Sequence, residues 1–158
     1  MHGRRWLADE MLGRLARYLR FLGGDVRYAR DVSDDEILRL AQDDGRTLLT
    51  RDRQLAARTP GSLLIRSHEI SEQLLEIRRA FPDLSLSVTF VRCSECNGLL
   101  GRWQRPPDGK WPEALPESFR SSEEPVFVCE GCGQFYWEGS HTRRIRSDIA
   151  RWTGSAPQ

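Results

Sequence analysis

Four cysteines, arranged as two pairs with the same spacing, carry the clearest chemical signal in the chain. The pairs are Cys93 with Cys96 and Cys129 with Cys132, each with two residues between the thiols. Two such pairs on tight turns can complete the tetrahedral four-sulfur shell that zinc prefers. Four protein ligands leave no open position on the ion, so we expect this zinc to stabilise the fold and to take no part in catalysis.

Disulfide or redox chemistry is the alternative for these cysteines. The chain begins without the apolar stretch of a secretion signal, so we expect a cytoplasmic protein, in which disulfides are disfavoured. Neither pair lies between a strand and a helix, where a thioredoxin-like redox pair would lie. The spacing therefore favours structural zinc.

Carboxylates form the second set of groups that could do chemistry. Asp9, Asp34 and Asp52 each follow a short run with the composition of a β-strand. If those strands are parallel, their carboxyl ends share one edge, which is where open α/β sheets bind ligands. Neighbouring carboxylates repel one another unless a cation lies between them, and Mg²⁺ or Mn²⁺ also binds phosphate oxygens. The pattern thus suggests a metal site for phosphodiester hydrolysis.

Helix capping is the simpler explanation of the same carboxylates. An aspartate at a helix start accepts hydrogen bonds from free backbone N–H groups and interacts favourably with the helix dipole. Ser33 and Glu36 have the spacing of a capping box, so Glu36 is either a cap or a metal ligand. Spacing alone leaves both interpretations open for these acids.

Alternating elements in the first 85 residues would position these groups. Helical periodicity at 9–22, 33–44, 52–55 and 70–80 follows strand-like runs at 5–8, 26–29, 47–50 and 62–65. This alternation predicts right-handed β-α-β units and a parallel sheet flanked by helices, an α/β fold. We place this domain at residues 1–86 and a zinc ribbon with a basic tail at 87–148.

The ribbon itself is predicted as hairpin, loop, hairpin. The proline-rich segment 102–125 is typical of a long irregular loop, and β-prone runs at 126–128 and 135–137 flank the second cysteine pair.

The net charge of +1 excludes a protein that holds a polyanion by its overall charge. Any contact with nucleic acid must therefore come from local clusters of positive residues. Arg14 and Arg17 lie on the polar side of the first predicted helix, with Phe21 beside them to stack on a base. A second basic stretch contains His141, Arg143 and Arg144. These side chains are either an RNA-contacting surface or a solvated polar face. No apolar run is long enough to span a membrane.

Six segments that contain the candidate residues form a recognisable combination. They are 7–20, 33–38, 48–52, 93–98, 129–133 and 136–141, in an order that extends over about residues 5–146. Together they resemble the PIN-like ribonuclease family typified by the carboxy-terminal domain of the mut-seven proteins. The resemblance implies a PIN-like three-layer domain followed by a zinc ribbon, and metal-dependent cleavage of RNA by an acidic cluster.

Carried over by position, Asp9, Asp34 and Asp52 match the acidic residues that hold Mg²⁺ or Mn²⁺ in this family. Glu36 or Asp31 can supply a fourth carboxylate. Typical PIN nucleases carry a further acid after the fourth strand, where this chain offers only the displaced Glu69.

The combined interpretation is a metal-dependent ribonuclease with Asp9, Asp34, Asp52 and Glu36 as its catalytic residues. Thr50 would orient a neighbour or a metal-bound water. The RNA-contacting residues would be Arg14, Arg17, Arg51, His141, Arg143 and Arg144. The alternative is a non-catalytic RNA-binding or ribosome-associated adaptor that binds through its zinc ribbon. A degenerate domain acting through a protein partner is a third possibility, and the sequence identifies no such partner.

Overall fold

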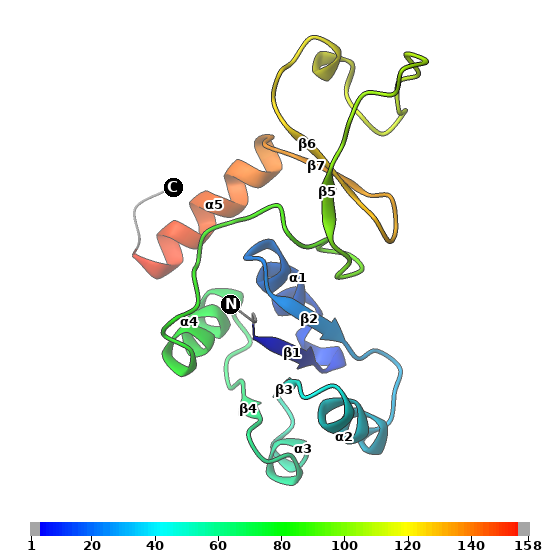
Figure 1. Cartoon of the computed structure of the whole chain (residues 1–158). Helices are drawn as coiled ribbons and strands as arrows, with labels where there is room; N and C mark the ends of the chain where they lie inside the picture. Colours follow the sequence, from blue (N-terminus) through cyan, green and yellow to red (C-terminus); the bar gives the residue numbers. More distant parts are fainter. Residues whose placement is uncertain (1–3, 155–158) are drawn as a thin grey trace.

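The computed structural model describes residues 4–154 and contains two sheets (Figure 1). The first sheet has the strand order β2-β1-β3-β4, and all neighbouring strands are parallel. Its strands are β1 (Arg5–Ala8), β2 (Asp25–Tyr28), β3 (Thr47–Thr50) and β4 (Leu63–Leu64). The chain places β2 on one side of β1 and β3 on the other, so the strand order reverses beside β1. The carboxyl end of β1 therefore lies at the point where such sheets bind ligands.

Helices cover both faces of this sheet, which confirms the predicted α/β fold. Successive residues of β1 point to opposite faces, so Trp6 and Ala8 join a core with α1 and α4, whereas Leu7 joins a second core with α2 and α3. The elements are η1 (Glu10–Leu12), α1 (Gly13–Phe21), α2 (Asp34–Asp43), α3 (Arg53–Arg58) and α4 (Ile70–Ala80).

The second sheet is antiparallel and has the order β5-β6-β7. Its strands are β5 (Leu100–Arg102), β6 (Val126–Cys129) and β7 (Phe135–Trp137). The segment between β5 and β6 is more ordered than its prolines suggested. It contains η2 (Glu117–Arg120), and Trp111 packs edge-on against Trp103 while Arg105 and Arg120 lie over the Trp111 ring.

The basic stretch after β7 is a helix, α5 (Ser140–Thr153), where the sequence analysis predicted only a basic tail. Ile145 and Ile149 of this helix are buried in the core that α1 and α4 share. Figure 1 shows α5 crossing back beside α4, and Trp152 contacts Tyr18 of α1. Because α5 begins in the ribbon and packs on the first domain, it joins the two parts of the molecule.

The turn 93–98, here called the first knuckle, docks on the edge strand β2. The side-chain oxygen of Asn97 accepts a hydrogen bond from the N–H of Val26 at 2.9 Å. The buried Arg20 of α1 donates to the carbonyl oxygens of Val26 and Ser94, both at 2.9 Å. The knuckle thereby occupies a sheet edge that would otherwise expose unpaired backbone groups.

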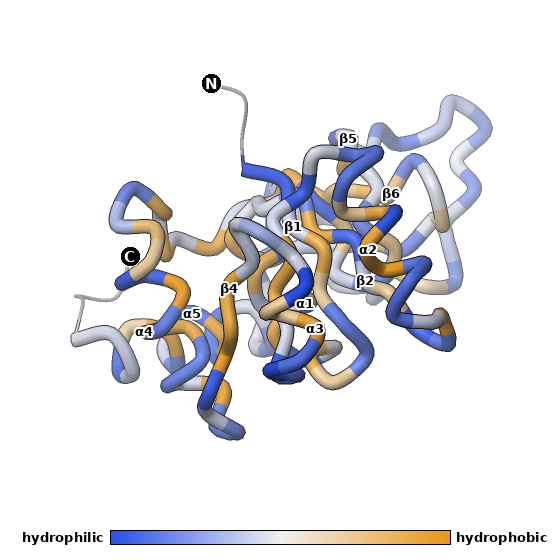
Figure 2. Tube along the Cα trace, turned by 90° about the horizontal axis from the view of Figure 1, so that it is seen from below, coloured by the Kyte–Doolittle hydropathy of each residue, from blue (hydrophilic) through white to orange (hydrophobic). Residues whose placement is uncertain are grey.

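Apolar residues are concentrated inside the fold. Figure 2 shows hydrophobic colour along β4 and hydrophilic colour on many of the outer turns. None of the helices in residues 4–154 is both long enough and apolar enough to cross a membrane.

Candidate functional site

The four cysteines lie together on two turns of the ribbon. Their Sγ atoms all lie within 4.8 Å of one another, with 3.6 Å between Cys93 and Cys132 and 3.4 Å between Cys96 and Cys129. Zinc–sulfur bonds of about 2.3 Å in a tetrahedron place sulfur atoms about 3.8 Å apart. The cluster therefore fits a zinc ion. Within residues 4–154, no other group of three or more metal-binding side chains is gathered as closely.

Hydrogen bonds direct these sulfurs toward a shared ligand position. Backbone N–H groups of the two turns donate to the Sγ atoms of Cys93, Cys96 and Cys129 at 3.3–3.5 Å. The Tyr136 hydroxyl lies 3.1 Å from the Sγ atom of Cys93. Donors directed at sulfur stabilise the thiolate, which is the form that binds metal.

Cys93 and Cys132 differ in pKa because hydrogen bonds dominate at the first, whereas burial and the neighbouring thiols dominate at the second. Burial raises the pKa of Cys93, but the hydrogen bonds from the Cys96 N–H and the Tyr136 hydroxyl outweigh burial and lower its pKa to about 7. At Cys132 the Gln134 N–H acts to lower the pKa, whereas burial and the neighbouring thiols raise it to about 12. A divalent cation would remove the repulsion that opposes several thiolates at this place.

Asp9, at the end of β1, is a buried carboxylate with both oxygens engaged. It is 4% exposed. Its Oδ1 atom accepts from the N–H of Met11 at 3.0 Å, which caps η1. Its Oδ2 atom accepts from the Thr50 hydroxyl and from the N–H of Arg51 at 3.2 Å. One oxygen thus acts as a helix cap, and the other is directed at the end of β3.

Thr50 connects Asp9 to Asp52. Its fully buried hydroxyl donates to Asp9 and accepts from the backbone N–H of Asp52 at 3.0 Å. The exposed Asp52 caps α3 with its Oδ1 atom, which accepts from the N–H groups of Gln54 and Leu55 at 2.7 and 3.0 Å. Among the described residues, the Oδ2 atom of Asp52 has no hydrogen-bond partner. The structure thus brings two of the three expected aspartates to one edge, around one hydroxyl.

Asp34 has a different neighbour from this pair. Arg58, the last residue of α3, is 4.0 Å from Asp34 and 2.6 Å from Asp35. Asp52 caps the opposite end of α3, and six helical residues extend over about 9 Å. Asp34 is not gathered with Asp9 and Asp52 into a close group of three metal-binding side chains within residues 4–154, so its part in the site stays a prediction.

The other acids considered from the sequence have separate partners. The Ser33 hydroxyl accepts from the Glu36 N–H at 3.3 Å, and the Glu36 carboxylate pairs with Arg39 at 2.5 Å. Asp31 is exposed, adopts a positive φ of 56° and lies 3.4 Å from Arg30. Glu69 stands at the start of α4 without a side-chain capping bond. None of these carboxylates is hydrogen-bonded to the Asp9–Thr50–Asp52 unit.

Arg17 and His141, expected to bind substrate, line one cavity of about 330 Å³ between α1, the first knuckle and the start of α5. Phe21, Tyr136 and Trp137 line it too, and these five residues define the aromatic pocket. The rings of Phe21 and His141 lie 6.2 Å apart, nearly edge to face. Arg17 also pairs with Glu95 at 2.5 Å. The sequence pattern indicated a strand at Tyr136 and Trp137 but did not indicate that they line a cavity with Arg17 and His141.

The remaining expected RNA contacts are distributed over three other places. Arg14 lies over the ring of Tyr18, and Arg143 and Arg144 are exposed in the first turns of α5. Arg51 lies at the end of β3, where its side chain contacts His68. A cavity of about 250 Å³ is lined by Arg51, Arg53, Arg66 and His68, and it is called the basic pocket. Arg53 and Arg66 were not among the residues expected to bind RNA.

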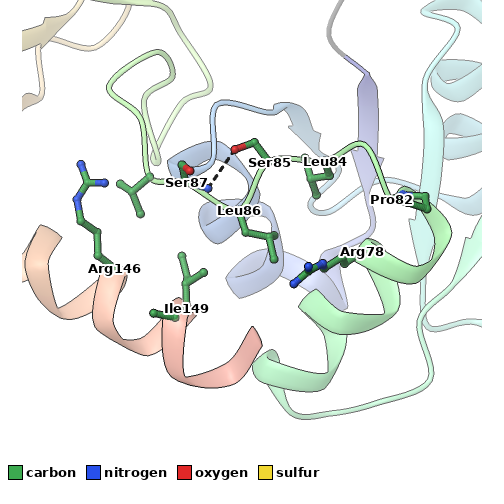
Figure 3. Close-up of a pocket in the computed structure, with 10 residues that line it drawn as sticks. Arg78, Pro82, Leu84, Ser85, Leu86, Ser87, Arg146 and Ile149 are labelled. Carbon is green, nitrogen blue, oxygen red and sulfur yellow. Dashed lines mark hydrogen bonds between the residues drawn. The ribbon is translucent and has the colours of Figure 1, made fainter. Parts of the chain in front are cut away.

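A third cavity lies away from the carboxylates. It has a volume of about 170 Å³ and lies between α4, α5 and the segment 82–88 (Figure 3). Leu84, Leu86 and Ile149 contribute apolar surface, and Arg78 and Arg146 lie at its sides. Arg78 belongs to the last turn of α4, a helix that begins just after β4, so this cavity is at the opposite end of α4 from the strand ends.

Fold and site define the class of protein: a parallel α/β domain with paired carboxylates at its strand ends and a four-cysteine ribbon packed against it. The family model of the Mut7-C RNAse domain matches residues 4–149, and the chain belongs to this family. This confirms the resemblance found in the sequence and indicates a ribonuclease-type function. Comparisons with curated proteins and with solved structures find no match.

Proposed function

We propose that this protein is a metal-dependent ribonuclease whose reaction centre is Asp9, Thr50 and Asp52. The observation that supports it is the buried Thr50 hydroxyl, which links the Asp9 carboxylate to the backbone of Asp52. Mg²⁺ and Mn²⁺ usually bind one or two carboxylates and keep several waters, so this pair fits either ion. Membership of an RNase domain family supports RNA as the substrate.

Each residue of the centre has a distinct role in this proposal. Asp9, held by three donors, presents a carboxylate of fixed orientation. Thr50 keeps Asp9 and Asp52 in register, and Asp52 offers its free oxygen to the ion or to a proton from the attacking water. When bound, the ion supplies a water of lowered pKa and stabilises charge on the phosphate. Asp34 and Glu36 remain candidates for further metal ligands. In this conformation Asp34 lies near Arg58, and Glu36 pairs with Arg39.

The aromatic pocket would hold a base of single-stranded RNA. Aromatic faces stack on any base, and Arg17 and His141 can contact the adjoining phosphate. Arg14 lies on the same helix, between Arg17 and the Asp9 end, and extends this positive surface toward the carboxylates. Arg143 and Arg144 add charge on α5. Backbone contacts of this kind give affinity with little sequence preference.

Zinc has a structural role in this proposal. The first knuckle and β7 belong to the ribbon, so a four-cysteine zinc centre would fix Tyr136 and Trp137 opposite Phe21.

The test combines cleavage with a binding measurement. Labelled single-stranded RNA is incubated with the zinc-loaded protein, with Mn²⁺, with Mg²⁺ or with neither. We expect metal-dependent cleavage by the unaltered chain and by the control Asp43→Asn, and a loss of at least about 100-fold in Asp9→Asn and Asp52→Asn. Thermal unfolding supplies the second readout, because an ion bound to the folded centre raises the melting temperature of the unaltered chain but not of Asp9→Asn.

The adaptor interpretation predicts a different pattern, in which the carboxylates act only as helix caps. RNA binding with a steep salt dependence, without cleavage and without metal-induced stabilisation, would establish it in place of the nuclease. Equal cleavage by all variants would show that the activity belongs to a contaminant.

A further inference from the structure

The basic pocket concentrates positive charge beside the proposed reaction centre. It lies at the carboxyl ends of β3 and β4 and is lined by Arg51, Arg53, Arg66 and His68, with no carboxylate in its lining. In the described part of the chain these three arginines form no ion pair, whereas nearby Arg58 pairs with Asp35. Its volume of about 250 Å³ lies below the range of about 300–1,000 Å³ typical of sites for drug-sized ligands, and suits a small anionic group.

A fixed loop positions two of the side chains that line the pocket. The Glu76 carboxylate of α4 accepts from the backbone N–H groups of Arg66 and Ser67 at 2.8 and 2.9 Å. Gln73 donates to the carbonyl oxygen of Ser67 at 3.0 Å. These bonds anchor the loop that follows β4, so Arg66 and His68 are held at the pocket by the helix behind them.

Arg51 has an unused donor here. Its Nε atom is buried without a hydrogen-bond partner, and buried polar groups are nearly always paired. Its Nη2 atom contacts Nε2 of His68. An anion in this pocket would accept hydrogen bonds from the guanidinium and from an imidazole N–H.

We propose that the basic pocket binds the terminal phosphomonoester of an RNA strand. This inference rests on the proposed ribonuclease function and adds the substrate end that the protein recognises. A backbone phosphodiester carries one negative charge, whereas a terminal phosphate carries close to two and offers three strong acceptor oxygens. Three guanidinium groups and an imidazole match the terminal group better.

The position of Arg51 links the proposed site for the RNA terminus to the proposed reaction centre. Its side chain lines the basic pocket, and its backbone N–H donates to the Asp9 carboxylate at 3.2 Å. A strand whose terminal phosphate occupies the pocket would therefore bring one of its first phosphodiester bonds to Asp9 and Asp52.

Direct binding to short RNAs with different ends tests this inference. Fluorescence anisotropy compares one single-stranded RNA with a 5′-phosphate, with a 3′-phosphate and with hydroxyl ends only, using the zinc-loaded chain without added Mg²⁺ or Mn²⁺. We expect one phosphorylated form to bind about tenfold more tightly than the hydroxyl form. The double variant Arg53→Gln/Arg66→Gln should lose this preference, and the control Arg79→Gln should keep it. Both altered side chains are exposed, and unchanged melting temperatures verify folding.

The outcomes separate this inference from the proposed function. Equal affinity for all three RNAs, or a preference that persists in the double variant, overturns terminal phosphate recognition. Metal-dependent cleavage in the same preparation then still supports the nuclease. Conversely, an end preference that the double variant abolishes supports the pocket even if no RNA is cut.

Discussion

At the residue scale, one hydroxyl determines how the two carboxylates of the centre are related. Thr50 is fully buried at the end of β3, and it both donates and accepts across the gap between β1 and α3. A valine has nearly the same shape and neither capability. The hydroxyl can therefore be tested separately from packing.

Thr50→Val should leave the Asp52 N–H without its acceptor and Asp9 without one donor. We expect the free energy of unfolding to fall by about 1–3 kcal/mol, measured by urea denaturation. The metal-induced rise in melting temperature should become smaller as well, because the hydroxyl that holds Asp9 and Asp52 in position relative to each other is lost. Thr50→Ser keeps the hydroxyl and should retain most of both quantities. A valine variant with an unchanged metal response would contradict the positioning role.

Asp25 is a second residue whose charge has a measurable consequence. Burial acts to raise its pKa, but hydrogen bonds from Arg46 and Asn97 outweigh burial and hold the pKa of Asp25 below its ordinary value of 3.8. A pKa that is lower in the folded state means that the carboxylate stabilises the fold above the unfolded-state pKa. This contribution is lost as the pH falls through the folded-state pKa.

Asp25→Asn should therefore destabilise the protein at neutral pH by about 2 kcal/mol, since Arg46 loses one of its two charged partners and keeps only Asp44. The difference from the unaltered chain should begin to narrow below about pH 4, the pKa of an aspartate in the unfolded chain, and should disappear only once the pH passes the lower pKa of Asp25 in the folded state. Melting temperatures measured between pH 3 and pH 7 check the trend. Glu113→Gln, an exposed change of equal charge, should show no such dependence. A constant difference across the range would contradict the assigned cause.

At the element scale, α1 connects the ribbon to the sheet through a single buried arginine. Arg20 donates to Val26 in β2 and to Ser94 and Glu95 in the first knuckle. Burial lowers its pKa, although the nearby cysteines and Glu95 act in the opposite direction. Its guanidinium thus satisfies backbone carbonyls of two separate elements.

Arg20→Met should lower the free energy of unfolding by about 3 kcal/mol or more, because it leaves several buried carbonyl oxygens without a hydrogen-bond donor. Guanidinium denaturation measures this loss. The control Arg14→Met, on the exposed side of the same helix, should change stability by less than about 0.5 kcal/mol. A similar small effect for Arg20→Met would show that the knuckle does not depend on this contact.

Sequence periodicity predicted the elements of the sheet domain well, and it failed where tertiary contacts decide. The segment 70–80 reads as a helix from Leu74 and Ile77, and the structure gives α4 the same bounds. In α5, Ile145 and Ile149 are the main buried apolar residues within a basic segment, so the pattern resembled a solvated tail. Asp34 was expected at the strand edge because it follows β2; its side chain lies 4.0 Å from Arg58, and its place in the site stays a prediction.

At the scale of the whole molecule, cysteine spacing and strand alternation predicted two units but not how they meet. The first knuckle pairs with the edge of β2, and α5 enters the core of the sheet domain. The aromatic pocket exists only because α1 and β7 are held against each other. Such contacts depend on shape and on loop direction, which spacing does not encode.

Zinc removal tests whether these contacts make one cooperative unit. Without the ion, repulsion between the cysteine thiolates should loosen the first knuckle, expose the edge of β2 and weaken the anchoring of α5. We expect a chelator to lower the melting temperature of the whole chain, with one calorimetric transition before and after. Hydrogen exchange at Val26, whose N–H bonds to Asn97, should accelerate with it. Two transitions, the upper one insensitive to zinc, would instead show that the sheet domain folds independently and that the ribbon only rests on its edge.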